Sequence, residues 1–298
     1  MSDCGEPAGQ LLPYLVNRGI QESQLRKAIV NHHDKQLPLL CFIHGNNNQS
    51  SDKFIERLEK HFLPTFEPQN TSVKRYFLNI EINHVAEIND ELLDCLGAKI
   101  LNLRPVTLDK IAQTIAQEPG PVLIETILYT SDWVNCEGIR LIEEFIKFWG
   151  DWPRLPAQNY LILICLRFCY LEIEKPTRWL RFLKPKSINQ EIKQYFENLD
   201  NILESLQMNG VVLSELGSIT LEQVEKWVEN YLRECSDIII PKIREWFSSP
   251  GHQIPMEQLA LHLKQLLITS QTKPSGHFNH GFSLLHRQTT ETTSCDSG

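Results

Sequence analysis

Four apolar runs, each followed by a helical pattern, constrain the fold of this 298-residue chain more than any other feature. The runs are "LPLLCFIH" (37–44), "RYFLNIEI" (75–82), "VLIETIL" (122–128) and "YLILICLRF" (160–168). Short apolar runs of this kind are typical of strands buried on both faces, as in a parallel sheet. Strands that alternate with amphipathic helices predict an α/β domain, which we place at residues 37–186.

The segments on either side of this domain have helical patterns. Residues 1–36 form an N-terminal helical lead. Residues 187–269 form a C-terminal helical part, in which we expect no further strand; within it, Thr220 and Gln223 have the spacing of a capping box. The remainder, residues 270–298, is rich in Ser, Thr, Gly and His, and we expect a disordered tail.

The charge and the cysteines restrict the function classes. A net charge of −8 argues against broad nucleic-acid binding, which needs an excess of Lys and Arg. The start "MSDCGEPAGQ" lacks the features of a signal peptide. The longest apolar run has about half the length of a membrane span and contains Arg167. Eight scattered cysteines are typical of reduced thiols, so we expect a cytoplasmic protein without a disulfide framework.

The stretch "IHGNNNQSSDKF" (43–54) lies where a nucleotide-binding P-loop would lie, between a buried strand and a helix. A P-loop reads G-x-x-x-x-G-K-[ST], and its glycines, lysine and hydroxyl hold the phosphates and Mg²⁺. Gly45 fits the first glycine. Ser50, Ser51 and Asp52 stand at the second glycine, the lysine and the hydroxyl positions. The loop is therefore a degenerate P-loop.

Asp52 argues most strongly against a bound phosphate. A carboxylate at the start of a helix complements the helix dipole at the place where a phosphate would bind. The Walker B element is also degenerate, because "VLIETIL" offers only Glu125 and this acid lies inside the apolar run. We therefore predict no catalytic residue, no cofactor and no metal, and we expect the chain not to be an enzyme.

Other reactive side chains have structural interpretations. No nucleophile or carboxylate motif accompanies His44, which we expect to be hydrogen-bonded near the end of its strand. Cys41 lies inside "LLCFI", and we expect it to be buried and inert. Cys165 and Cys169 share one face of a strand but lack the usual spacing of metal ligands.

The stretch "EKPTRWLRFLKPKS" (174–187) mixes basic and aromatic residues, as single-stranded nucleic-acid sites do. The other interpretation is a connecting loop whose aromatic rings pack and whose charges face water. We favour the loop because the net charge is negative. The stretch is also suited to an acidic protein partner. Its basic residues are Lys175, Arg178, Arg181, Lys184 and Lys186.

Several stretches together resemble the inactive STAND (iSTAND) family, which is common in cyanobacteria and related multicellular bacteria. They are "LLPYLVNRGIQESQL", "LPLLCFIHGNNNQSSDKFIERLEKHFLP", "FIKFWGDWPRLPAQNYLILICLRF", and "LSELGSITLEQVEKWVENYLRECSDIIIPKIREWF" followed by "IPMEQLALHL". The resemblance covers most of residues 11–268. The chain departs from the family at Val16-Asn17-Arg18, where relatives often carry Cys-Asp-Arg.

The resemblance implies a P-loop NTPase-like fold that has lost its catalytic residues. Such domains are associated with signalling and conflict (defence) systems, where small effector-associated adaptor domains are joined to them or recruit them. We therefore expect a protein-interaction scaffold or adaptor with protein partners, without a small-molecule substrate and without membrane binding. Two other functions stay open: a nucleotide-binding switch without hydrolysis, and a nucleic-acid-sensing module that uses residues 175–186.

Overall fold

The computed structural model describes residues 12–16, 18–32, 36–66, 71–82, 84–154, 160–171, 185–233, 236–247, 249 and 251–271. The chain divides into two compact units. The first, here called the sheet unit, comprises Arg18–Asn47 and Ser51–Leu216. The second, here called the helical unit, comprises Met1–Asn17, Asn48–Ser50 and Gly217–Gly298.

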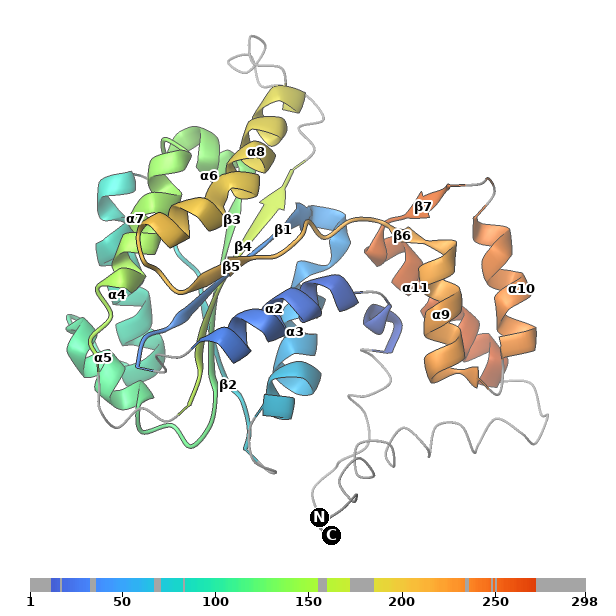
Figure 1. Cartoon of the computed structure of the whole chain (residues 1–298), viewed down its shortest axis with the longest axis horizontal. Coiled ribbons are helices and arrows are strands. Elements are labelled where there is room, and N and C mark those ends of the chain that lie inside the picture. Colours follow the sequence, from blue (N-terminus) through green and yellow to red (C-terminus); the bar gives the residue numbers. More distant parts are fainter. Residues whose placement is uncertain are drawn as a thin grey trace. The chain divides into compact units, whose positions relative to one another are not determined.

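The sheet unit contains a five-stranded parallel sheet in the order β2-β3-β4-β1-β5 (Figure 1). All neighbouring strands are parallel, so the chain must cross a face of the sheet between one strand and the next, and helices form these connections. This arrangement confirms the predicted α/β fold class, a P-loop NTPase-like parallel sheet with helices on both faces. The strands are β1 (Leu39–Asn46), β2 (Lys74–Leu78), β3 (Val122–Tyr129), β4 (Ile162–Tyr170) and β5 (Gly210–Val212).

The three central strands are buried along almost their whole length, which explains their continuous apolar sequences. β4 and β1 are in direct register, with Leu39 opposite Leu163 and Cys41 opposite Cys165. β2 lies at one edge and is only partly buried. Its shorter length, compared with the predicted 75–82, fits an edge position, where fewer side chains are enclosed.

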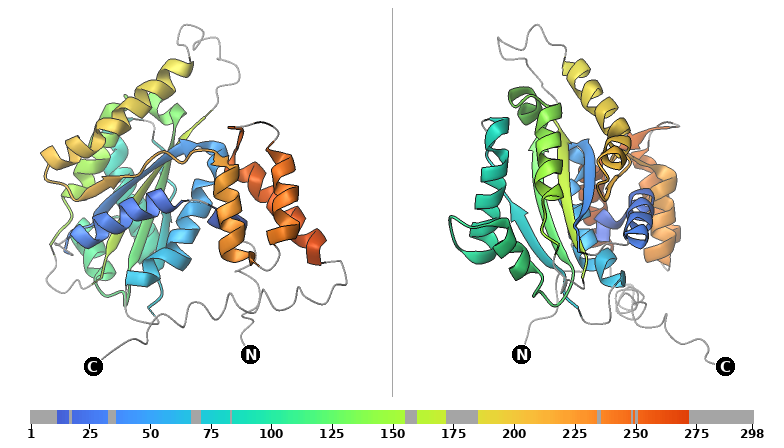
Figure 2. Two further views of the ribbon diagram at one scale, coloured as in Figure 1. Left: turned by 45° about the vertical axis from the view of Figure 1, so that its right-hand side comes forward. Right: turned by 60° about the vertical axis from the view of Figure 1, so that its left-hand side comes forward.

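Helices cover both faces of the sheet (Figures 1 and 2). One hydrophobic cluster joins Phe42 of β1 to Phe145, Trp149 and Phe196. The helices around it are α4 (Ile88–Leu96), α5 (Leu108–Ile115), α6 (Thr130–Asn135), α7 (Ile139–Gly150) and α8 (Pro185–Ser205). On the other face, Leu25, Phe54 and Ile55 pack against β1 and β4. They belong to α2 (Gly19–Asn31) and α3 (Ser51–Arg57).

Short helical turns complete the connections. The helix predicted from Asp52 onward is α3, which continues through a π-helical turn and a 3₁₀ turn to Phe66. The 3₁₀ turns are η1 (Leu12–Leu15), η2 (Asn47–Gln49), η4 (Leu63–Phe66) and η5 (Val85–Glu87); the π turns are η3 (Leu58–Phe62) and η6 (Gly97–Leu101).

The helical unit is built around a core that includes Val16, Trp227 and Leu263. Its elements beside η1 are β6 (Ile219–Thr220), α9 (Leu221–Tyr231), α10 (Ser236–Trp246), β7 (Gln253–Ile254) and α11 (Met256–Gln271). β6 and β7 pair antiparallel. None of the described helices combines the length and the hydrophobicity that a bilayer span requires.

The structure corrects one expectation for the C-terminal part. Strands do not end near residue 187, because β5 adds a fifth strand and β6 and β7 form a pair. Segments of two or three residues are too short to show a period of two, so their sequences give no strand signal.

The division into four segments stays a prediction. The structure groups α8 with the sheet, and the predicted boundary between residues 186 and 187 falls inside this helix. The predicted disordered tail lies outside the described residues from position 272 onward.

The capping box at the start of α9 is confirmed. The Gln223 N–H donates to Thr220 Oγ1 (3.4 Å), and the Thr220 N–H donates to Gln223 Oε1 (2.9 Å). These bonds satisfy backbone groups that the first turn of a helix leaves without intrahelical partners.

We predict that Thr220→Ala destabilises the start of α9 by about 1 kcal/mol, because the hydroxyl cap is lost. Thr220→Ser keeps a hydroxyl and serves as the matched control. Amide hydrogen exchange in Leu221–Tyr231 measures the effect directly. Equal exchange rates in the Ala and Ser variants would show that the cap does not stabilise this helix.

Candidate functional site

The degenerate P-loop lies at the carboxyl end of β1, where open parallel sheets usually bind ligands. β1 ends at Asn46, the turn η2 follows, and α3 begins at Ser51. Ser50, at the second glycine position, has a φ of 53°. This left-handed conformation is one that glycine adopts at lower cost. The backbone therefore keeps the conformation expected of a glycine although the glycine has been replaced.

Gly45 is explained by packing within the chain. A Cβ atom at this position would lie 2.8 Å from the Leu216 carbonyl oxygen and 2.9 Å from the Leu216 Cβ. The two residues form a parallel bridge, and the Leu216 N–H donates to the His44 carbonyl oxygen (2.8 Å). A glycine is required here for the close approach of two backbone segments, even without a phosphate.

Ser51, at the lysine position, is hydrogen-bonded to β4. Its hydroxyl oxygen accepts from Arg167 Nη1 (3.3 Å) and lies 3.5 Å from Cys169 Sγ. Arg167 and Cys169 are both buried. Protein groups thus occupy the surroundings of the side chain that would contact the β and γ phosphates in a P-loop.

Asp52 and Lys53 follow Ser51 in the first turn of α3. Asp52 lies in the first turn and is exposed, in agreement with its predicted position at the helix start. Lys53 Nζ forms an ion pair with Glu56 Oε2 (2.8 Å), and Lys60 Nζ binds the other oxygen of the same carboxylate (2.6 Å). Burial would raise the pKa of Glu56, but hydrogen bonds from the two lysines lower it to about 2. The Lys53 ammonium group is therefore paired with a carboxylate of its own helix.

Gln49, inside the degenerate loop, binds other parts of the helical unit. Its side chain is buried; Nε2 donates to Ser218 Oγ (3.1 Å), and Oε1 accepts from the Met256 N–H (3.3 Å). The Met256 N–H belongs to the first turn of α11, whose backbone donors need partners. One side chain of the loop thus caps a helix of the same unit.

Glu125 lies in the middle of β3 with 0% exposure, and two arginines neutralise it. Arg75 Nε donates to Glu125 Oε1 (2.7 Å), and Arg167 Nε lies 3.0 Å from Glu125 Oε2. Arg75 also binds Glu59 through Nη1 (3.0 Å). We call these four residues the arginine–glutamate array. Both carboxylate oxygens of Glu125 are paired with arginines of the array. Glu125 also lies four residues before the end of β3, so it is not positioned as a Walker B acid.

Arg75 and Arg167 also line an open hollow on this face of the sheet. The hollow has a volume of about 510 Å³, and its other lining residues are Glu59, Phe77 and Glu125. The Arg167 guanidinium carbon lies 6.0 Å from the centre of the Phe77 ring. Burial lowers the pKa of Arg75, but the attraction and hydrogen bonds of Glu125 and Glu59 outweigh burial and raise it. The hollow is therefore lined by charges that already neutralise one another.

The carboxyl ends of β3 and β4 are joined by internal hydrogen bonds. The buried Thr130 hydroxyl accepts from the Leu171 N–H (3.2 Å) and donates to Asn189 Oδ1 of α8 (3.1 Å). The Asp132 carboxylate accepts from the Tyr129 N–H (2.7 Å) and caps α6. In the described part of the chain, no three His, Cys, Asp or Glu side chains are placed to hold a metal ion.

The remaining candidates have the structural surroundings expected of them. His44 Nδ1 is hydrogen-bonded to the Tyr170 hydroxyl (2.7 Å), and the ring stacks on Phe196 with a centroid distance of 4.8 Å. Burial lowers the pKa of His44 to about 4, so the ring is neutral at pH 7. Cys41 is buried and lies opposite Cys165, whose pKa is raised by burial.

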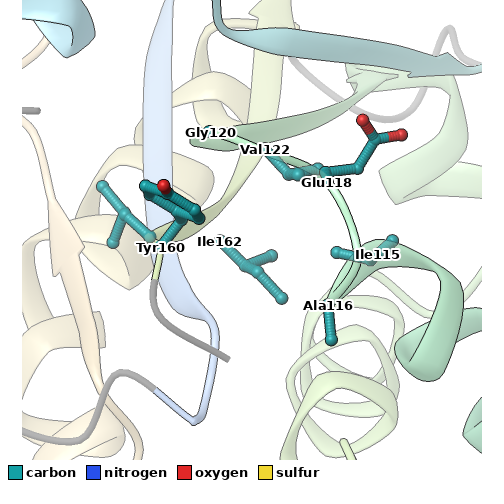
Figure 3. A pocket seen from close by; sticks show the side chains of 8 residues that line it. Ile115, Ala116, Glu118, Gly120, Val122, Tyr160 and Ile162 are labelled. Atoms are coloured by element: carbon teal, nitrogen blue, oxygen red, sulfur yellow. The ribbon is translucent and has the colours of Figure 1, made fainter. Parts of the chain in front are cut away.

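A separate cavity lies near the amino ends of β3 and β4, which begin at Val122 and Ile162 (Figure 3). It is lined by the side chains shown in Figure 3, including Ile115 and Tyr160. Its volume is about 10 Å³, which is roughly the minimum for one water molecule. It is therefore a packing gap. The basic stretch 174–187 lies outside the described residues as far as position 184.

Sequence reasoning identified the loop residues and Glu125 but missed the arginines that bind Glu125. A signal was present, because an acid inside an apolar strand requires a buried cation, and Arg167 interrupts another apolar strand. Gln49 and Thr130 carried no signal, because their partners depend on tertiary contacts.

A protein-family model described as inactive STAND (iSTAND) matches residues 13–167, just over half of the chain. No curated protein matches the chain significantly in sequence.

Several solved structures are similar at low identity. The Aeropyrum pernix ORC2 protein in its ADP form is 12% identical with a TM-score of 0.44; the match covers 87% of this chain and 65% of that chain, less than two thirds of its length. The same protein in ADPNP–ADP complexes is 14% identical with a TM-score of 0.46; the match covers 95% of this chain and 69% of that chain. A chain of the E. coli MS115-1 HORMA:CdnC:Trip13 complex is 14% identical with a TM-score of 0.39; the match covers 97% of this chain and 88% of that chain.

We predict that Glu125→Gln lowers the free energy of unfolding by about 3–5 kcal/mol, because it leaves the buried Arg167 charge without its counterion. Glu59→Gln removes only the outer carboxylate of the array, which is partly exposed, and should cost less than about 1 kcal/mol. Urea unfolding of both variants gives the comparison. Equal losses would show that Glu125 is not the central charge of the array.

We also predict a pH effect that depends on His44. Its pKa is about 4 in the folded state and about 6.5 when unfolded, so the unfolded chain binds a proton first as the pH falls. The stability that comes from the neutral ring is fully present above pH 6.5 and is lost progressively toward pH 4. The whole effect amounts to about 3 kcal/mol at most.

The matched variant is His44→Gln, which cannot titrate and keeps a polar atom for Tyr170. Glu215 and Lys193, the charged groups near the ring, are present in both proteins. The difference in unfolding free energy between the two proteins should shrink as the pH falls, measured by urea unfolding at several pH values. A difference that does not change with pH would contradict the assignment of a neutral, buried ring.

Proposed function

Because the chain belongs to the inactive STAND family, we propose that it is a catalytically inactive scaffold or adaptor for protein interactions. The setting that we propose is a bacterial signalling or conflict (defence) system. The partners would be effector-associated or signalling proteins. A small-molecule substrate, a membrane and nucleic acid are not part of the proposal, and the net charge of −8 supports the omission of nucleic acid.

One observation carries the proposal. Ser51, which replaces the P-loop lysine, is hydrogen-bonded to Arg167, and the charge of Arg167 is neutralised by the buried Glu125. A triphosphate needs an unpaired cation at this position to offset its own charge. Arg167 does not supply one, because moving it to a phosphate would leave Glu125 buried with only Arg75 as its counterion.

The exposed Asp52 supports the same conclusion from the other side of the site. Its carboxylate stands at the start of α3, where it would repel a phosphate. A cytoplasmic location is also part of the proposal. It is supported by the cysteines in the described part of the chain, all of which are free thiols.

We predict that millimolar Mg-ATP or Mg-GTP does not raise the melting temperature of the protein, because a ligand that binds the folded state would stabilise it. Asp52→Ala is the companion variant, since it removes only the repelling carboxylate. No shift in the variant would show that the lost lysine and second glycine are sufficient to prevent binding. A shift of several degrees in the wild-type protein would contradict the scaffold and indicate a nucleotide-binding switch.

The interaction role has its own test. The full chain, carrying an affinity tag, would be purified from its native cells and the bound proteins identified by mass spectrometry. A protein partner bound in stoichiometric amount supports the adaptor. Purification with bound RNA or DNA, and without a protein partner, would contradict it and favour the nucleic-acid-sensing alternative.

A further inference from the structure

An open pocket lies between α2 and α8, beside the amino ends of β1 and β5. Its volume is about 370 Å³, which is within the range of pockets that hold small organic ligands. Both helices pack along β5 (Figure 1), and both bind this edge of the sheet. The Val212 N–H donates to Asp200 Oδ1 (2.9 Å), and the Ser214 N–H donates to Gln24 Oε1 (2.9 Å). The pocket therefore has two fixed walls.

The buried part of the pocket lining is mainly apolar and closely packed. Leu39 at the start of β1 and Leu203 of α8 are each 2% exposed. Gly210 lets β5 approach α8, since a Cβ atom at this position would lie 2.8 Å from Leu203 Cδ1. His32, at the end of α2, is also buried, and its Nε2 donates to the Leu37 carbonyl oxygen (2.9 Å). We call this buried part of the lining the floor; its contacts hold it in place without a ligand.

The exposed part of the lining contains two carboxylates and neither Lys nor Arg. Asp200 and Glu204 are four residues apart on α8, so their side chains are neighbours on one side of the helix. Like charges at this spacing destabilise a helix. Among the residues that the structure describes, neither carboxylate has a cationic partner, and Lys193 of the same helix pairs with Glu215 (2.8 Å). A cation bound in the pocket would relieve the repulsion.

The remaining polar side chains at the rim are neutral amides. Asn31 is exposed on α2, across the pocket from the carboxylates of α8, and Asn209 directly precedes β5. An amide oxygen accepts hydrogen bonds, and an ammonium group donates three. The pocket thus offers acceptors on both walls, above a floor that suits methylene groups.

We propose that this pocket binds an aliphatic diamine or polyamine. One ammonium group would lie on Asp200 and Glu204, the methylene chain would lie over the floor, and the second ammonium group would donate to the Asn31 amide oxygen. Lysine side chains divide their contacts in the same way, with the stem on an apolar surface and the ammonium group among polar groups. This inference goes beyond the adaptor role and does not depend on it.

Other classes of ligand fit the lining less well. An anion would be repelled by both carboxylates. A metal ion would need more oxygen ligands than these two side chains provide, and no third acid, His or Cys in the described part of the chain is placed to join them. A neutral apolar molecule would leave the repulsion between Asp200 and Glu204 as it is.

The test is a calorimetric titration of the full chain with putrescine, a four-carbon diamine, and separately with Mg²⁺, which carries the same double charge. Putrescine should bind and should raise the melting temperature, because it binds the folded state. Mg²⁺ at the same concentration and ionic strength should do neither, since it makes no use of the apolar floor. The affinity for putrescine should fall as salt is added, because the carboxylates are exposed.

Three variants locate the site. Glu204→Gln removes one carboxylate and leaves the bond between Asp200 and Val212 intact, and it should weaken putrescine binding about tenfold. Asn31→Lys places an ammonium group at the rim and should abolish binding. Glu197→Gln is the matched control, because it removes an exposed carboxylate of the same helix outside the pocket, and binding should not change. Thermal melting without ligand confirms that each variant is folded.

Four results would overturn the proposal. A wild-type protein that does not bind putrescine at millimolar concentration would exclude the ligand class. An equal response to Mg²⁺ would show that only the net charge of −8 is being screened. Unchanged affinity in Glu204→Gln would place the binding elsewhere. Equal losses in Glu204→Gln and Glu197→Gln would indicate diffuse binding to an acidic surface.

Discussion

The ion pairs of Glu125 with Arg75 and Arg167 are the constraint on which the rest of the sheet unit depends. A carboxylate with 0% exposure in the middle of a strand is stable only when nearby cations offset its loss of hydration. Arg75 comes from β2 and Arg167 from β4, so the three strands must keep one register for the charges to meet. Arg167 then reaches Ser51 at the start of α3. The degenerate loop is thus tied to the array, and a nucleotide would have to compete with bonds that the fold already requires.

The loop also shows that the shape of a P-loop can persist without its ligand. Gly45 is fixed by the approach of Leu216, and Ser50 accepts a left-handed backbone conformation that a glycine would adopt more easily. Gln49 supplies an acceptor to the first turn of α11. The conformation or contacts of each of these residues are explained by interactions within the chain itself. The preserved geometry therefore carries no information about a phosphate, and the chemistry of the side chains decides the question. On that criterion, Ser51 and Asp52 argue against binding.

The sequence predicted the parts of the fold that follow from local patterns. β1, β3 and β4 were visible as apolar runs because both of their faces are buried, and the degenerate loop was visible from its spacing. β5 was not visible, because three residues cannot show a period. Of the two partners of Glu125, Arg167 gave a signal because it interrupts an apolar strand, but Arg75 was beyond prediction. Arg75 lies 50 residues away in sequence, and only the pairing of β2 with β3 brings the two together. The acid inside an apolar run indicated that a buried cation was needed, but it did not identify Arg75.

Arg75 connects the arginine–glutamate array to the β2 edge of the sheet. Its guanidinium belongs to the array, while its backbone N–H and C=O groups face away from β3 at the β2 edge. Through Glu125, this edge residue is joined to Arg167 and from there to Ser51 of the degenerate loop. The proposed loss of nucleotide binding thus rests on ion pairs that also hold three strands of the sheet together, because a phosphate could recruit Arg167 only by weakening them.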